Sequence, residues 1–191
     1  MKKILTIVAL CVIGVLVVTT MALGFINTDF AQVTINDAIS VTVHKGGTKT
    51  QIYYKDTDAE EYNKFVSMFN TQSEQSVLKS LFTGAYSVEP EVVNETIGMT
   101  SKLTSGYWLV YRFETAQTLK IDGKEYEDKS SADTKVTYKK LALSVTETEG
   151  MELVTMYIFS DVDSANSSHT VRVYANLAET YNYINNLEIV G

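Results

Sequence analysis

The chain has 191 residues, of which 45% are hydrophobic, with a formal net charge of −7 and a single cysteine. This composition excludes a disordered chain. The surplus of acidic groups would repel phosphate backbones, so we expect no nucleic-acid partner.

The N-terminus carries the clearest pattern in the chain. Lys2 and Lys3 precede an uncharged apolar run over residues 4–23. About 20 such residues are what a helix needs to cross a bilayer, and the lysines ahead of the run place the N-terminus in the cytoplasm and the rest outside. We therefore expect a single-pass signal anchor, a transmembrane helix in the cell membrane, at residues 1–24, and a juxtamembrane linker at residues 25–31.

The alternative for this segment is a signal peptide cleaved near Ala22 or Gly24, which would release a secreted protein. Cys11 does not indicate a lipid anchor, since Leu10 precedes it where lipoprotein signals resemble one another in having a small residue. Because Cys11 lies inside the apolar run, the remaining chain cannot form a disulfide. In this respect, and in its MKK start, the chain resembles exported proteins of Gram-positive envelopes.

Residues 32–191 are expected to form a single extracytoplasmic domain. Alternation of apolar and polar residues predicts a hairpin of two strands over residues 39–55, with Ile39, Val41 and Val43 on one face.

A helix is expected directly after this hairpin. Thr57 and Glu60 match a capping box, and apolar residues follow at helical spacing. These residues are Tyr62, Phe65, Val66 and Phe69. A second helical pattern covers residues 73–82 and ends at Gly84, and residues 85–106 predict a long loop with at most one short strand.

The rest of the chain predicts strand after strand and then a final helix. The expected strands are 107–115, 118–121, 124–127, 135–147, 151–160 and 169–175. Asn176 caps the helix that follows. The buried stripe of this helix consists of Leu177, Tyr181, Ile184 and Leu187.

One phrase occurs twice, as AEEYNKF at residues 59–65 and as AETYNYI at residues 178–184. Each copy follows an expected hairpin, which favours two strand-strand-helix (ββα) units, although two capped helices can also match by coincidence. The fold class we expect is α+β: an antiparallel sheet of about six to eight strands with two or three helices packed on one face.

The sequence lacks the common catalytic and cofactor signatures, among them Gly-x-Ser-x-Gly, His-Glu-x-x-His, the P-loop and Cys-x-x-Cys. Ser76 and Lys79 have the Ser-x-x-Lys spacing of penicillin-binding enzymes, but the partner motifs are missing. His44 and His169 stand near the ends of expected strands, and residues 161–166 alternate oxygen-bearing side chains without the glycine of a calcium loop. We expect no catalytic residue, no metal and no cofactor.

The two arginines of the chain, Arg112 and Arg172, both lie in the middle of expected strands. By alternation Arg112 shares a face with Trp108, and Arg172 shares one with Tyr174. A guanidinium beside aromatic rings binds carboxylates, sugars or partner proteins, so we expect these four side chains to form a binding surface. The alternative is that each arginine stacks on a tyrosine and pairs with a glutamate, which only stabilises the sheet.

Two functions fit these observations. The first is a non-enzymatic binding or interaction module, anchored by its N-terminal helix in the lipid bilayer, that meets an envelope component or a neighbouring membrane protein. The second is a secreted or anchored hydrolase that uses a pair of carboxylates, which the acidic composition permits.

Overall fold

The computed structural model describes residues 2–25, 27–29, 35–72, 74–76, 91–121, 124–127, 135–147, 150 and 152–189. Its centre is a seven-stranded sheet in which every neighbouring pair is antiparallel. In sheet order the strands are β3 (Thr50–Tyr54), β2 (Ala38–Lys45), β6 (Tyr107–Thr118), β9 (Thr137–Val145), β10 (Glu152–Phe159), β11 (Asn166–Ala175) and β5 (Glu91–Gly98). Two small two-stranded sheets pair β1 (Asn27–Asp29) with β4 (Glu74–Ser76) and β7 (Lys120–Ile121) with β8 (Lys124–Glu125).

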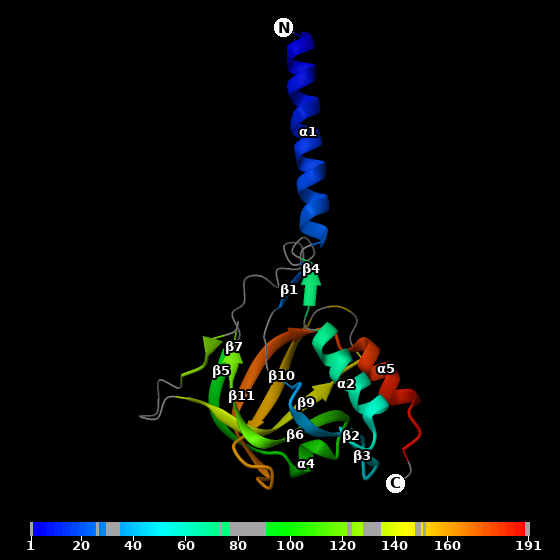
Figure 1. Ribbon diagram of the computed structural model, residues 1–191, viewed down its shortest axis with the longest axis vertical. Coiled ribbons are helices and arrows are strands. Elements are labelled where there is room, and N and C mark those ends of the chain that lie inside the picture. The colour runs from blue at the N-terminus through cyan, green and yellow to red at the C-terminus, as the bar shows by residue number, and fades with distance from the viewer. Residues whose placement is uncertain are drawn as a thin grey trace.

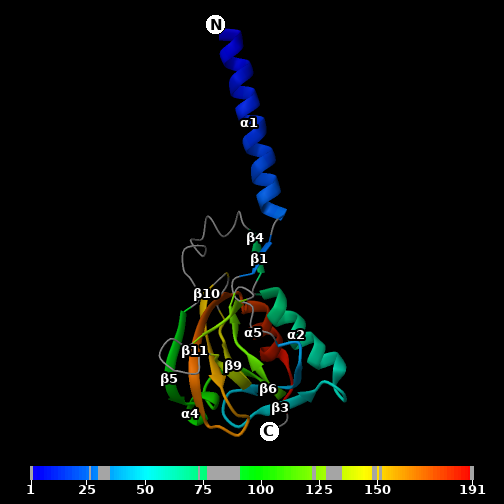
Figure 2. The same cartoon turned by 60° about the vertical axis from the view of Figure 1, so that its left-hand side comes forward.

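The described part of the chain contains four helices: α1 (Lys2–Phe25), α2 (Ala59–Gln72), α4 (Thr100–Leu103) and α5 (Ala178–Asn186). Helices α2 and α5 lie side by side against the large sheet (Figures 1 and 2). The predicted α+β class is confirmed in this form, as a mostly antiparallel sheet with helices.

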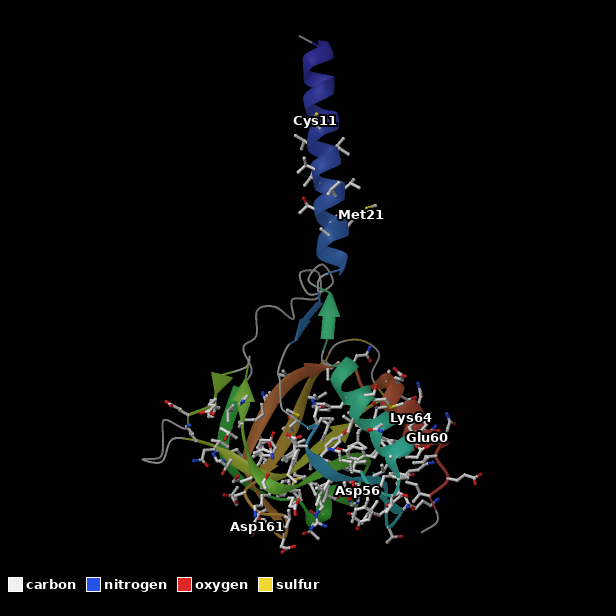
Figure 3. The ribbon with its side chains drawn as sticks, viewed as in Figure 1. Cys11, Met21, Asp56, Glu60, Lys64 and Asp161 are labelled. Carbon is white, nitrogen blue, oxygen red and sulfur yellow. The ribbon has the colours of Figure 1, made fainter. Side chains whose placement is uncertain are left out.

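Helix α1 projects away from the sheet and carries the N-terminus to the far end of the molecule (Figure 1). Its side chains are described for residues 11–22, and all of these are exposed. Figure 3 shows Cys11 and Met21 extending from the helix with no other element beside them. Among the residues whose side chains are described, no helix is long and apolar enough to cross a membrane.

The main core lies between the sheet and helices α2 and α5. Tyr62 and Phe65 of α2 and Ile184 of α5 are almost fully buried against the strands. Alternate residues of the central strands point toward them: Val41, Val43, Leu109, Tyr111, Phe113, Leu141, Leu143, Met156 and Ile158. We call this side of the sheet the helix face. The helical stripes expected from the sequence are therefore the packed ones.

The opposite side of the sheet, which we call the α4 face, has a smaller core. It consists of Met99, Trp108, Val110, Ala142 and Phe159. Leu103 of α4 packs against this cluster, together with Ile97 and Tyr157. The short helix α4 therefore covers part of a face that α2 and α5 do not reach.

Three local expectations differ from the structure. Ile39 is 42% exposed, whereas Val41 and Val43 are buried, because the pairing of β2 with β6 shifts by a residue between Ala38 and Ser40. Such a bulge turns the displaced side chain off the regular face.

The start of α2 also differs. The helix begins at Ala59, and Thr57 does not form the expected capping box with Glu60; its hydroxyl donates to the Asp58 carboxylate at 2.8 Å. That carboxylate also accepts the Tyr54 N–H at 3.0 Å, so it fixes the turn before the helix.

The third difference concerns residues 73–106. Within the helix expected at 73–82, residues 74–76 form strand β4, and 77–82 lie outside the described residues, as does Gly84. The expected loop contains β5, a full edge strand of the large sheet, and helix α4. The other hairpins are present. Helix α5 begins at Ala178 with Leu177, not the expected Asn176, at its N-cap position, although the Asn176 side chain accepts the Ala178 N–H at 3.2 Å.

Candidate functional site

The register of the strands decides which predicted residues share a face. Arg112 lies opposite Lys140, which in turn lies opposite Phe159 of the α4-face core. Arg172 lies opposite Thr155, two residues from Tyr157 of the same face. The two arginines and Trp108 therefore all belong to the α4 face.

Sharing a face does not bring the arginines together. Arg112 and Arg172 are separated by three strand spacings and by four residues along the strands, which places their Cα atoms roughly 20 Å apart. The backbone of Tyr174 pairs with Leu153 beside Arg172, and its side chain lies outside the described residues. The four residues do not form one continuous site.

Trp108 lines a hollow of about 380 Å³ on the α4 face, which we call the Trp108 hollow. Its walls come from the end of α4, from β6, and from the facing ends of β9 and β10. They are Lys102, Ser105, Trp108, Ser144, Thr146, Glu152, Leu153, Val154, Thr155 and Tyr157. Arg172 and Tyr174 are the cross-strand partners of Thr155 and Leu153, so three of the four predicted residues lie in or beside this hollow.

The chain between α4 and β6 holds Trp108 in place. The Ser105 N–H and hydroxyl both donate to the Lys102 carbonyl at 3.0 Å, and Gly106 follows with φ of 77°, a conformation that favours glycine. The indole Nε1 of Trp108 then donates to the Ser105 carbonyl at 2.7 Å. The side chain is only 6% exposed, so it forms the floor of the hollow.

A second aromatic ring completes the hollow. The ring centroids of Trp108 and Tyr157 are 5.6 Å apart at an angle of 53°, and the Lys102 ammonium lies 5.6 Å from the Tyr157 centroid. Lys102 and Glu152 bring one charge of each sign, and the hydroxyls of Ser105, Ser144, Thr146 and Thr155 surround the rings. Aromatic surface next to hydroxyls and a balanced pair of charges suits a polar ligand without a large net charge.

A hydrolase that uses a pair of carboxylates is the alternative that the acidic composition permits. A carboxyl group that acts as an acid near neutral pH needs a raised pKa. The described carboxyl groups with a resolved shift are Asp58 and Glu125, and both shift downward. The Tyr54 N–H lowers the pKa of Asp58, and the hydrogen bond from Lys135 lowers that of Glu125. No described carboxyl group with a resolved pKa shift favours a hydrolase, which stays a prediction.

The structure also locates the other motifs of the sequence. Ser76 lies in β4, and Lys79 lies outside the described residues. Within the described residues no group of three or more His, Cys, Asp or Glu side chains could hold a metal ion. The loop at 161–166, which alternates oxygen-bearing side chains, holds an ammonium group: Lys140 Nζ donates to the carbonyls of Val162 at 2.8 Å and Ser164 at 2.6 Å.

The sequence reasoning missed two features of this face. The sequence predicts Tyr157 only as part of a strand; the alternation along β10, which sets Tyr157 on the face opposite to Met156 and Ile158, is the signal that could have found it. Lys102 had no signal, because α4 is too short to show a helical period.

Comparison with known proteins adds no relative. No family model matches the chain, and neither a curated protein nor a solved structure does.

Proposed function

We propose that this protein is a non-enzymatic binding module, held in a membrane by its N-terminal helix, which binds a polar component of the cell envelope outside that membrane. The observation that carries the proposal is the Trp108 hollow, where two aromatic rings, four hydroxyls and a balanced pair of charges meet on the face that α2 and α5 leave open.

Helix α1 supports the anchor. Its 24 residues extend about 36 Å at the usual helical rise. In the described range the apolar side chains are solvent-exposed and unpacked: Val12, Ile13, Val15, Leu16, Val17, Val18 and Met21. An apolar surface of this size requires a cover, and a bilayer provides one along the whole uncharged run of residues 4–23. Lys2 and Lys3 favour the orientation with the N-terminus in the cytoplasm.

The position of the hollow fits a tethered module. Helix α4 lies at the end of the sheet domain farthest from the N-terminus in both views (Figures 1 and 2). With α1 in a membrane, the end of the domain that carries α4 would lie away from the bilayer. Glycans are the polar envelope components that we favour as ligands, since aromatic rings stack on sugar faces while hydroxyl and charged groups bind sugar hydroxyls.

Trp108 provides a direct assay, because it is the only tryptophan in the chain. We would titrate the full-length protein in detergent with soluble peptidoglycan fragments and follow tryptophan emission. Saturable changes are expected, and Tyr157→Ala should weaken binding at least about tenfold, the loss expected from one stacked ring. Tyr54→Ala is the matched control, because Tyr54 is 49% exposed and does not line the Trp108 hollow.

Unchanged emission with these fragments, or equal losses in both tyrosine variants, would reject the glycan ligand. The anchor is tested separately by fractionating cells that express a C-terminally tagged protein and by taking its intact mass. A full-length mass in the membrane fraction supports the anchor, whereas a mass that begins near Leu23 or Phe25 in the medium contradicts it.

A further inference from the structure

A second hollow lies on the other side of α4, separate from the Trp108 hollow. It measures about 420 Å³ and opens between α4, the turn that joins β2 to β3, and the loop that joins β10 to β11. Its walls are His44, Gly47, Thr48, Thr50, Met99, Thr100, Leu103, Thr104, Lys140, Phe159, Ser164 and Ala165. We call it the Lys140 hollow. Asp161, in the loop beside it, lies at the end of the sheet domain opposite α1 (Figure 3).

The walls of this hollow are mainly apolar, and their charge has one sign. Among the described residues, Lys140 is the only lysine of these walls, and no aspartate or glutamate lines the hollow. His44 contacts the Thr50 hydroxyl through Nδ1 at 3.3 Å, and burial lowers its pKa, so the imidazole is neutral at pH 7. In a chain with a net charge of −7, a concave apolar surface with a lone cation is a distinct electrostatic environment.

The ammonium of Lys140 is held in place but not neutralised. It donates to the carbonyls of Val162 and Ser164, which are uncharged, and lies 4.4 Å from the centroid of the Phe159 ring. An ammonium group has three N–H donors, and these two carbonyls use two of them. Lys140 is half-buried, so its charge is only partly screened by water.

A second cation adds to this charge. Arg112 lies directly opposite Lys140 in the pairing of β6 with β9. Among the described residues no carboxylate forms an ion pair with either side chain. Burial and then the Arg112 guanidinium lower the pKa of Lys140, and the more weakly coupled Asp163 and Asp161 do not offset this effect. Two adjacent cations without a paired anion repel each other, and a bound anion would remove that repulsion.

We infer that the Lys140 hollow binds a small organic anion, a carboxylate with an apolar body. The carboxylate would accept a hydrogen bond from Lys140, with the charge of Arg112 adding to the attraction, and the body would lie against Met99, Leu103 and Phe159. The volume is in the usual range for a small-molecule site. The inference concerns another hollow and another ligand class than the proposed function, so either one can fail without the other.

Benzoate and benzyl alcohol form a matched pair of probes, since they share the ring and differ in the charged group. Binding to the isotope-labelled full-length protein in detergent is followed by NMR, using the amides of Thr100, Thr104 and Ser164. Benzoate should cause saturable shifts there, and benzyl alcohol should bind at least about tenfold more weakly, the factor expected for one charge-assisted hydrogen bond. Inorganic phosphate, an anion without an apolar body, should also bind more weakly than benzoate.

Variants of Thr100 test the sign of the charge without removing Lys140 from its carbonyl partners. Thr100 is exposed at the rim of the hollow, whereas the exposed Ser101 beside it does not line the hollow. Thr100→Glu should weaken benzoate binding severalfold, Thr100→Lys should strengthen it, and Ser101→Glu should change it little. Lys140→Gln should reduce it at least tenfold.

Equal binding of benzoate and benzyl alcohol would overturn the inference. So would equal effects of Thr100→Glu and Ser101→Glu, because the bound group would then not sense the charge inside the hollow. If Lys140→Gln lowers the stability of the fold, the Thr100 series still decides the question.

Discussion

Two buried tyrosines, one in α2 and one in β6 that contacts α2, allow the geometry of the main core to be tested by one matched pair of substitutions. Tyr62 is 2% exposed, and its hydroxyl donates to the Ala38 carbonyl in β2 at 2.6 Å. Tyr111 is fully buried in β6, and its hydroxyl donates to the Phe65 carbonyl in α2 at 3.3 Å. Tyr62→Phe and Tyr111→Phe each remove a hydroxyl and leave the ring in place.

The two substitutions should lower the free energy of unfolding by different amounts. The short bond from Tyr62 links α2 to β2, and its loss in a dry core should lower the free energy of unfolding by about 1–2 kcal/mol. The bond from Tyr111 is longer than the usual O–H···O range. Its acceptor also lies within α2, where the helix supplies an N–H donor of its own. Tyr111→Phe should therefore cost less than about 0.5 kcal/mol.

Urea unfolding of both variants, followed by the emission of Trp108, measures these differences. The wild type and Tyr54→Phe, a substitution at an exposed ring, serve as controls. A cost for Tyr111→Phe equal to or above that of Tyr62→Phe would refute the reasoning, because bond length and the alternative donor would then not decide the energy.

Two further predictions concern stability. Burial raises the pKa of Tyr111 and of Tyr138 in the folded state. The stability that the two neutral tyrosines contribute is therefore complete below about pH 10, and it is lost as the pH rises beyond 10, by at most about 1.4 kcal/mol per pH unit for each tyrosine. Urea midpoints from pH 8 to 11 should fall only above pH 10, and a flat profile would contradict the burial. Separately, the Lys45 ammonium donates to the carbonyls of Asn185 and Leu187 at the end of α5, at 2.6 and 2.8 Å. Lys45→Met should cost about 1 kcal/mol or more and should speed amide exchange in α5, whereas the exposed Lys49→Met should change neither.

The sequence predicted those elements in which one face is consistently buried. Alternation revealed β6, β9 and β10, because their residues point by turns to the helix face and to the α4 face. The stripes of α2 and α5 were found for the same reason. Strand β5 was missed because it forms an edge: Asn94, Glu95 and Thr96 are exposed in succession, so the period of two is lost.

For the site, the sequence predicts only which side chains share a face of their own strand, because this depends on local alternation. Alternation placed Trp108, Arg112 and Arg172 on faces, but the order of the strands decides which residues become neighbours, and a single sequence does not encode that order locally. Strands β6 and β9 pair although β7 and β8 lie between them in the chain. The sequence therefore predicts Lys140 only as one polar residue of a strand, while its position opposite Arg112 depends on this long-range pairing.

The two faces of the sheet differ in what they carry: the main core lies on the helix face, and the two hollows lie on the α4 face. Helices α2 and α5 complete a large core on the helix face, including the stacked rings of Tyr107 and Tyr181 at 4.9 Å. Because that core already buries the inward side of the central strands, the α4 face needs only a small cluster under one helical turn. Lys102 is exposed and Lys140 is half-buried at the border of this cluster, and each lines one of the two hollows proposed as ligand sites. This division implies that substitutions at the rims of the two hollows should change binding more than stability, whereas the reverse should hold on the helix face.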